Sequence, residues 1–422
     1  MRVELRSLAA ILALLAVALG CTDAPERDLP DVVIGSTTES PAASPPASPA
    51  PEVPTDVGRL AVLDDLGNLL TLGPDGSDTI VLAEAVQGET LVQQPTWSPD
   101  GKRLAWVQLE ASESGVAASL VTATAEGGRP TRAPTSGAPF YLSWDPTSSR
   151  IAYLGPSPTS EIELGIVEVA SGGDEATPLD AGSPFYLSWG PSGEQLLVHV
   201  GSERLERLDL DGAPSTVDGR PGTFNAPVWT PDGGSFVYAS RSGERQRLVV
   251  HDLGEERGRE LVRFDGGIRF VVSPEGTRVA FQVVDGSAGV GALSVVDRET
   301  GTIERVAEGP APAFFWSPEG GRLLYLYADP DAERLWLRWG IWDGSTTFST
   351  PRFYPTPVFG RDYLQFFEQY AQSMSLWAPD GTAFAYAGTS ESGEQGIWVQ
   401  PARSGAEPVL VADGVFAAWS PT

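Results

Sequence analysis

A short string of residues recurs along the chain and constrains its fold more than any other feature. The string reads aromatic-Ser-Pro-Asp/Glu-Gly, and its clearest copy is Trp97-Ser98-Pro99-Asp100-Gly101. The proline of each copy stands at position 99, 146, 191, 231, 274, 318, 379 or 421. The intervals are 47, 45, 40, 43, 44, 61 and 42 residues, and all but one are close to the length of a four-stranded blade. We therefore expect one small β unit to be repeated along the chain.

Each copy combines a tight-turn signal with an apolar run typical of a strand. Proline presets φ and glycine accepts a positive φ, so Ser-Pro-Asp-Gly predicts a turn. The runs that follow are rich in apolar and β-branched residues, and shorter runs that end in an acidic residue or glycine supply the remaining strands. The strands expected directly after the turns are Arg103–Val107, Arg150–Leu154, Ser235–Ala239 and Arg278–Phe281.

The repeats predict an all-β fold, a single β-propeller of four-stranded blades over residues 58–422. One unit alone would expose two sheet edges and an apolar face, so the units must pack face to face around an axis. Seven of the twelve Trp residues occupy the aromatic position of the motif, where we expect indole rings to pack between blades. The intervals predict eight blades, and seven is the alternative if the 61-residue interval is misread.

The two ends of the repeat region predict how the ring closes. The last motif strand, Phe416–Ser420, has no strands after it, whereas three strands between residues 59 and 82 have no motif strand before them. We expect the C-terminal strand to pair with these N-terminal strands and complete one blade. Trp419 should then lie close to Leu60 and Leu69.

The unit Trp-Ser-Pro-Asp-Gly-x-x-Leu-Ala, at residues 97–105, resembles the repeats of TolB-type, WD-like bacterial propellers. The resemblance covers residues 58–422 and implies a propeller fold. From TolB it also implies a periplasmic role with envelope partners. Similar repeats occur in propellers of prolyl oligopeptidase relatives, so the resemblance implies no single activity.

Residues 1–21 predict a bacterial lipoprotein signal peptide. Arg2 and Arg6 precede an apolar run, Leu8–Leu19, which is too short to span a bilayer but suits a signal peptide. Ala18-Leu19-Gly20-Cys21 resembles a lipobox, which implies lipidation of Cys21. Ala18 stands where a branched aliphatic residue is usual, so cleavage and secretion form the alternative. We expect an extracytoplasmic protein held on a membrane by this lipid anchor, on the periplasmic side or outer face of the cytoplasmic membrane.

Residues 22–57 predict a disordered linker between the anchor and the propeller. The segment is rich in Pro, Ser and Ala and contains no aromatic residue. Such a segment cannot form a packed core and acts as a semi-rigid spacer.

Charge and composition exclude several functions. A formal charge of -28 repels nucleic acids and anionic lipids. One Cys and two His, His199 and His251, cannot make a Cys/His zinc site, and no Gly-x-Ser-x-Gly elbow is present. We expect no catalytic residues, metal or cofactor, and we expect both His to be ordinary strand residues. The motif carboxylates are interpreted as turn formers, separated around the ring: Asp100, Asp232, Glu275, Glu319 and Asp380.

The longest interval contains an aromatic-rich insertion at residues 346–374. A short helix is predicted over Arg361–Tyr370, because aromatic residues at 359, 363, 366/367 and 370 share one helical face. This face either packs on the ring and plugs its channel, or forms a surface for a partner or ligand. The candidate binding residues are Phe353, Tyr354, Tyr363, Phe366, Phe367 and Tyr370.

The predicted function is a non-catalytic, monomeric scaffold that binds a protein or another envelope component. One alternative is a small-ligand sensor or transport accessory, with a channel lined by Phe140, Tyr141, Phe185 and Tyr186. Another is a lyase or hydrolase that acts on a carbohydrate or peptide. A wide pocket with converging carboxylates favours an enzyme, whereas an aromatic, partly plugged channel favours binding.

Overall fold

The computed structural model describes residues 53–422 apart from 114, 160, 170–171, 173–174, 211–213, 218–219, 244, 286–288 and 332–333. The predicted signal peptide, Cys21 and most of the predicted linker lie outside the described residues. Val53 and Val57, at the end of the predicted linker, pack against the hydrophobic core. The folded part therefore begins before Gly58.

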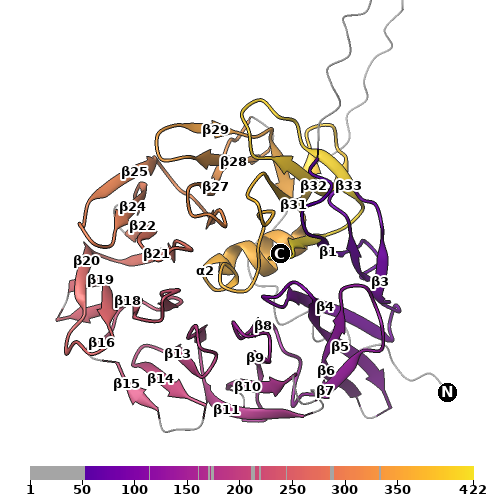
Figure 1. Ribbon diagram of the computed structural model, residues 1–422, viewed down its shortest axis with the longest axis horizontal. Coiled ribbons are helices and arrows are strands. Elements are labelled where there is room, and N and C mark those ends of the chain that lie inside the picture. The colour runs from indigo at the N-terminus through magenta and orange to yellow at the C-terminus, as the bar shows by residue number, and fades with distance from the viewer. Residues whose placement is uncertain are drawn as a thin grey trace, which may run out of the picture. The chain divides into compact units, whose positions relative to one another are not determined.

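The described residues form antiparallel sheets that follow one another around a central axis (Figure 1). The first sheet contains β34 (Phe416–Trp419), β1 (Leu60–Leu63), β2 (Leu69–Leu72) and β3 (Ile80–Ala83). The second contains β4 (Thr90–Trp97), β5 (Arg103–Ser112), β6 (Gly115–Thr124) and β7 (Thr131–Pro134). The third contains β8 (Tyr141–Trp144), β9 (Arg150–Pro156), β10 (Ile162–Glu168) and β11 (Ala176–Gly182).

The next three sheets continue the ring. The fourth contains β12 (Phe185–Trp189), β13 (Gln195–Val200), β14 (Arg204–Asp209) and β15 (Ser215–Thr216). The fifth contains β16 (Arg220–Pro221), β17 (Val228–Trp229), β18 (Ser235–Ser242), β19 (Arg245–Asp252) and β20 (Arg259–Phe264). The sixth contains β21 (Gly267–Val272), β22 (Arg278–Asp285), β23 (Gly289–Val290), β24 (Leu293–Asp297) and β25 (Ile303–Ala307).

The last sheet joins strands from two repeat units. It contains β26 (Phe314–Trp316), β27 (Leu323–Ala328), β28 (Leu337–Trp342), β29 (Thr347–Ser349), β30 (Phe353–Pro355), β31 (Ala383–Ser390), β32 (Gln395–Pro401) and β33 (Val409–Ala412). Strand β30 pairs with β28 through Phe353 and Leu337, and with β31 on its other side. The described residues thus form seven hydrogen-bonded sheets. The number of eight blades, which counts this joined sheet as two, stays a prediction.

The C-terminal strand lies in the first sheet beside the N-terminal strands. β34 pairs with β1, so that Trp419 stands opposite Leu60 and Phe416 stands opposite Leu63. The backbone N–H of Arg59 also donates to the Ser420 hydroxyl at 2.9 Å. These contacts place the two ends of the repeat region together, where the sequence led us to expect them.

A recurring hydrogen bond joins neighbouring inner strands. The indole N–H of a motif Trp donates to the carbonyl of the residue just before the motif aromatic of the preceding unit, as Trp144 does to Thr96 at 3.2 Å. The same bond links Trp97 to Ala418, Trp189 to Ser143, Trp316 to Val271 and Trp377 to Phe315. The bond from Trp97 to Ala418 joins the first complete unit to the C-terminal strand.

An arginine at the start of the second strand strengthens several of these junctions. The Arg103 guanidinium lies 5.4 Å from the Trp144 ring centroid and donates to the Ser148 carbonyl at 2.7 Å. Arg322 makes the equivalent contacts with Trp377 and Gly381. A guanidinium over an indole ring adds cation–π attraction to the buried apolar area.

Antiparallel pairing gives the ring two distinct faces. We call the face that holds the Ser-Pro-Asp-Gly turns the motif face. The hairpin face holds the turns between the second and third strands of each unit, together with the loops that lead into the inner strands. Loops on a rigid scaffold carry most binding residues.

A matched pair of substitutions tests the indole hydrogen bond. The indole N–H of Trp229 is buried without a hydrogen-bond partner among the described residues, whereas that of Trp97 donates to Ala418. Trp97→Phe removes a hydrogen bond that Trp229 does not make, so it should cost about 0.5–1.5 kcal/mol more unfolding free energy than Trp229→Phe. Urea unfolding measures both. Equal losses would contradict a role for the hydrogen bond itself.

Candidate functional site

The centre of the ring is occupied by the predicted aromatic insertion. Its helical part consists of a π-helical turn η2 (Phe359–Tyr363), a 3₁₀ turn η3 (Leu364–Phe366) and α2 (Phe367–Tyr370). Figure 1 shows α2 inside the ring of sheets. We call residues 359–374 the plug. The predicted helix is thus present, but it consists of a π-helical turn, a 3₁₀ turn and an α-helical turn in succession.

One glutamine of the plug binds two inner strands. The Gln369 amide nitrogen donates to the Leu187 carbonyl at 2.8 Å, and its amide oxygen accepts the Leu187 N–H at 3.0 Å. The same amide nitrogen donates to the Tyr141 hydroxyl at 2.9 Å, which itself donates to the Gln369 carbonyl. The Gln369 side chain therefore continues the hydrogen bonding of β12 toward the axis.

Aromatic contacts hold the rest of the plug. The Tyr363 ring stacks on Phe416 of β34 with centroids 3.9 Å apart, and Phe367 lies 4.6 Å from Phe314 of β26. The Tyr370 hydroxyl donates to the Gln94 side chain at 2.7 Å. The plug thus contacts inner strands from opposite ends of the sequence.

Four of the six candidate binding residues are buried, as in the alternative in which the aromatic face packs on the ring. Phe353, Tyr363, Phe367 and Tyr370 are each at most 6% exposed, because the ring packs around them. Tyr354 and Phe366 are 53% and 42% exposed. The buried face of the plug follows residues 359, 363, 367 and 370, so Phe366 points away from it.

Phe353 has a structural role that the sequence did not reveal. Its ring lies 4.6 Å from Tyr386 and stacks with Trp339 at 5.9 Å. These neighbours come from the two repeat units that β30 joins. Phe353 is therefore part of the core that merges them into one sheet.

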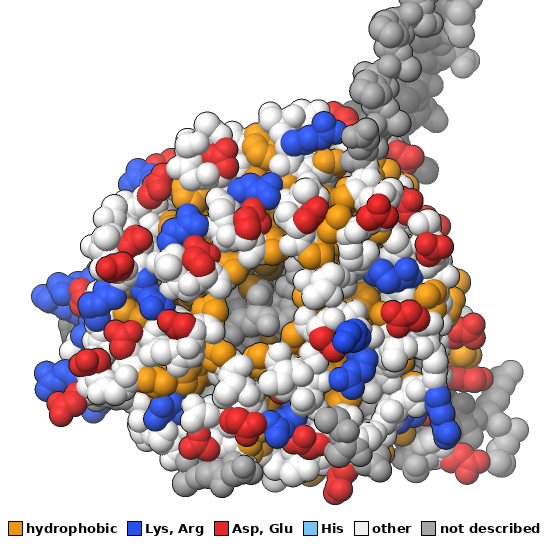
Figure 2. All heavy atoms as spheres, in the orientation of Figure 1, with side chains coloured by type: hydrophobic (Ala, Val, Ile, Leu, Met, Phe, Trp, Pro, Cys, Tyr) orange, Lys and Arg blue, Asp and Glu red, His pale blue; other side chains and the backbone are white. Residues whose placement is uncertain are grey.

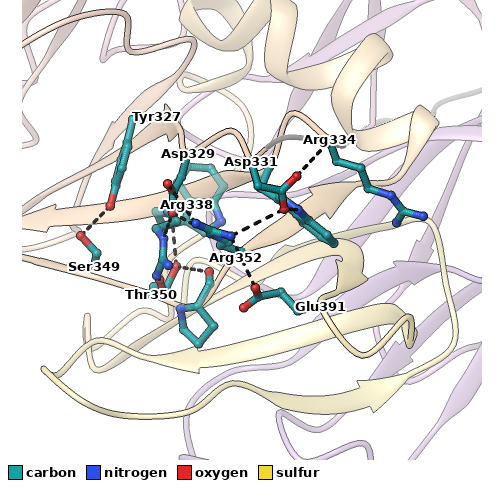
Figure 3. Close-up of polar contacts among 12 residues, drawn as sticks. Tyr327, Asp329, Asp331, Arg334, Arg338, Ser349, Thr350, Arg352 and Glu391 are labelled. Atoms are coloured by element: carbon teal, nitrogen blue, oxygen red, sulfur yellow. Dashed lines mark hydrogen bonds and ion pairs between the residues drawn. The ribbon is translucent and has the colours of Figure 1, made fainter.

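An ion-pair network covers this junction on the hairpin face (Figure 3). Asp329 accepts hydrogen bonds from Arg338 and from Arg352, the latter at 2.8 Å. Arg352 also lies 3.9 Å from Glu391, in the turn between β31 and β32. The hydrogen bond from Arg352, followed by that from Arg338, lowers the pKa of Asp329. A carboxylate held ionised by two arginines is suited to joining loops rather than to accepting a proton.

A second group of polar side chains surrounds the plug inside the ring. The carboxyl group of Glu368 accepts the Phe270 N–H at 3.1 Å. Part of this side chain is accessible, but the carboxyl group is buried. Burial raises the pKa of Glu368 to about 8, although the hydrogen bond from the Phe270 N–H and the charge of Arg269 both lower it. Burial raises the pKa of Tyr186 to about 12, and the charge of Glu368 adds to this shift. Glu368 can therefore be protonated at neutral pH and donate a hydrogen bond.

The other residues that the sequence singled out are spread over the ring. Among the predicted channel residues, Tyr141 and Phe185 are buried, Tyr186 is half-buried and Phe140 is 43% exposed. The motif carboxylates act within their own turns, as Asp100 does by accepting from the Ser98 hydroxyl at 2.6 Å. His199 and His251 lie in β13 and β19. In the described part of the chain, no three His, Cys, Asp or Glu side chains are grouped to hold a metal ion.

Comparison with known proteins supports the fold. No protein-family model and no curated protein matches this chain. Among solved structures, a eukaryotic initiation factor matches with a TM-score of 0.53 and 11% identity, over 87% of this chain and 99% of that one. A prolyl endopeptidase matches with a TM-score of 0.50 and 15% identity, over 78% of this chain and 50% of that one.

TolB from Acinetobacter baumannii is also similar, with a TM-score of 0.41 and 14% identity over 66% of this chain and 74% of TolB. At these identities the matches concern the fold alone. That fold is a β-propeller, so the predicted fold class is confirmed. In the part of the chain described above, no helix combines the length and apolar character needed to cross a bilayer.

Three polar residues of the ring centre were missed by the sequence analysis: Gln369, Glu368 and Arg269. Gln369 and Glu368 stand among the aromatic residues of the insertion, and this was the available signal. Arg269 occupies the third position before the motif aromatic, as Tyr141 and Tyr186 do in their units. Aligning the repeats at that position would have identified the side chains that face the plug.

The pKa of Glu368 predicts a pH-dependent effect of Glu368→Gln. In the folded protein the pKa is raised to about 8 from 4.5, so the folded state binds more protons between these values and loses stability as pH rises. Gln keeps the acceptor for Phe270 and does not ionise. The variant should gain thermal stability over the parent as pH rises from 4.5 to 8 and keep that advantage above pH 8. Melting temperatures across this range measure the effect, and a difference independent of pH would contradict it.

Proposed function

We propose that this protein is a non-catalytic binding scaffold whose hairpin face holds a partner. The observation that carries the proposal is the plugged centre, where the buried aromatic rings of residues 359–374 take the place of a channel ligand. An aromatic, plugged channel favours the binding of a partner over catalysis. A partner would then contact the surface loops.

The distribution of exposed apolar side chains supports the hairpin face. Of the exposed large hydrophobic residues in the described chain, four lie at or next to the motif-face ends of strands: Val81, Leu253, Ile303 and Leu410. Eight lie at the hairpin-face ends: Leu66, Val86, Leu91, Val116, Phe140, Val290, Leu335 and Tyr354. More exposed apolar side chains on one side of the ring than on the other favour that side as the protein-binding surface.

Tyr354 and Phe366 are the proposed anchors. Both are aromatic, both are exposed, and both come from the insertion. Aromatic side chains bury a large area at low conformational cost, and they dominate the affinity of many interfaces.

The proposal includes the anchor and location expected from the N-terminal sequence. A lipid on Cys21 and the linker that follows would hold a monomeric propeller outside the cytoplasm, where its partner is an envelope protein or another envelope component. The lipobox resemblance at residues 18–21 and the linker composition support this part. Mass spectrometry of the membrane-bound protein tests it by detecting an acylated Cys21.

Site-specific photocrosslinking tests the binding face. A benzoylphenylalanine at position 354 or 366 of the full chain should give light-dependent adducts with a discrete partner. The same probe at Leu253 or Ile303, which are exposed to a similar degree on the other side, should give none. Adducts from positions 253 and 303 alone would contradict the proposal.

Substitution of the anchors gives a quantitative test. Tyr354→Ser combined with Phe366→Ser should weaken binding of the crosslinked partner by about thirtyfold, because interface aromatics contribute about 2 kcal/mol or more. Both side chains are exposed, so urea unfolding should be nearly unchanged. Unchanged affinity in a folded double variant would show that the partner binds elsewhere.

A further inference from the structure

A cavity of about 500 Å³ lies on the hairpin face between the fourth and fifth sheets. The turn after β13, the loop that follows β16 and the hairpin of β18 and β19 form its walls. Ser202, Phe224 and Arg241 represent these three segments. Cavities of about 300–1,000 Å³ are typical of small-molecule sites.

The lining of this cavity is unlike the rest of the protein. The chain carries 56 acidic residues and a formal charge of -28, yet no Asp or Glu lines the cavity and Arg241 does. In an acidic protein, a cavity that is lined by a positive side chain and by no carboxylate favours an anionic ligand.

Hydrogen-bond donors, most of them exposed, are found at the cavity without protein partners. The hydroxyls of Ser183, Ser202 and Thr223 line the cavity. In the described part of the structure, these hydroxyls and the Arg241 guanidinium make no hydrogen bond or ion pair. A guanidinium beside free hydroxyls can bind phosphate or carboxylate oxygens with charge-assisted hydrogen bonds.

Arginines also gather around the cavity. In the strand register, Arg220 stands directly opposite Arg241, so two arginines lie side by side at the cavity. Figure 2 shows Lys and Arg side chains grouped along the edge of the ring formed by β16–β20. Like charges directly across a strand pair are destabilising. An anion bound beside Arg241 would relieve this repulsion. Two acidic residues, Glu203 and Asp265, stand in the adjacent turns but do not line the cavity.

The loop of residues 222–224 is held in place as one wall. The Gln246 amide oxygen accepts the Thr223 N–H at 2.7 Å, and its nitrogen donates to the Gly266 carbonyl at 2.7 Å. A Cβ atom at Gly222 would lie 2.9 Å from the Gln246 amide oxygen and 3.0 Å from the Ala239 carbonyl carbon. The loop can approach β18 this closely only with glycine at 222.

The inner wall of the cavity is aromatic and has polar groups behind it. Phe224 stacks on Tyr186 with centroids 4.6 Å apart and lies 5.0 Å from the His199 ring. His199 and Asn225 are each 1% exposed, and the His199 Nε2 and both polar atoms of the Asn225 side chain have no partner among the described residues. The Phe224 ring thus stands between the cavity and buried polar groups that do not line it.

We propose that this cavity binds a sugar-sized ligand that carries a phosphate or carboxylate group. Arg241 and the three hydroxyls bind the anionic oxygens, and Phe224 contacts the body of the ligand. The site does not depend on a protein partner at Tyr354 or Phe366.

Calorimetric titration of the purified full chain tests the proposal with glucose 6-phosphate, glucuronate and glucose. At least one of the two anionic sugars should bind saturably, and glucose should bind at least tenfold more weakly. Binding of the phosphate compound alone identifies phosphate as the recognised group, and binding of glucuronate alone identifies carboxylate. Absence of saturable binding for both anions would overturn the proposal, while the photocrosslinking result would be unaffected.

Variants locate the binding to the cavity. Arg241→Gln should weaken binding about tenfold or more, and Thr223→Val, which keeps the charge, about fivefold. Arg257→Gln is the matched control, since Arg257 is an exposed arginine of the same sheet in the turn between β19 and β20, and it should change the affinity by less than about twofold. Equal losses for Arg241→Gln and Arg257→Gln would show only non-specific charge attraction and would overturn the site.

Discussion

The hydrogen bond from a motif indole to the preceding inner strand is the interaction on which the ring depends. Each unit has an apolar face that only the next unit can cover, and at five junctions the indole covers it while donating to a backbone carbonyl of the neighbouring inner strand. The bond from Trp97 to Ala418 has the same form although the two residues are far apart in sequence. The junction between the chain ends is thus built like the junctions between consecutive units.

A ring built this way leaves its axis open, and this chain fills the axis with its own residues. Gln369 binds the backbone of β12, and Tyr363 stacks on β34, so the plug links strands of the fourth and first sheets. The filled centre directs the proposed binding to the hairpin face. There, exposed apolar side chains and the cavity beside Arg241 offer separate surfaces for a protein partner and a small anion.

The repeat made most of the fold predictable, because turn chemistry and strand pattern act within a few residues. Strands β5, β9, β18 and β22 begin at the predicted residues, and the buried face of the plug follows the predicted helical spacing. The burial and the pKa of individual side chains could not be predicted, because they depend on contacts across the ring. Phe353 and Tyr354 are adjacent and chemically alike, yet strand pairing by β30 buries one and exposes the other. The raised pKa of Glu368 likewise arises only once the sheets surround it.

β34 holds the two ends of the ring together and supports its plug. Hydrogen exchange of the full chain, compared with a chain that ends at Val415, tests it most directly. Loss of β34 should expose β1, leave the Trp97 indole without its acceptor and remove the ring on which Tyr363 stacks. We predict faster exchange in β1–β4 and in residues 359–374 together. Unchanged protection of these segments in the shortened chain would contradict the account.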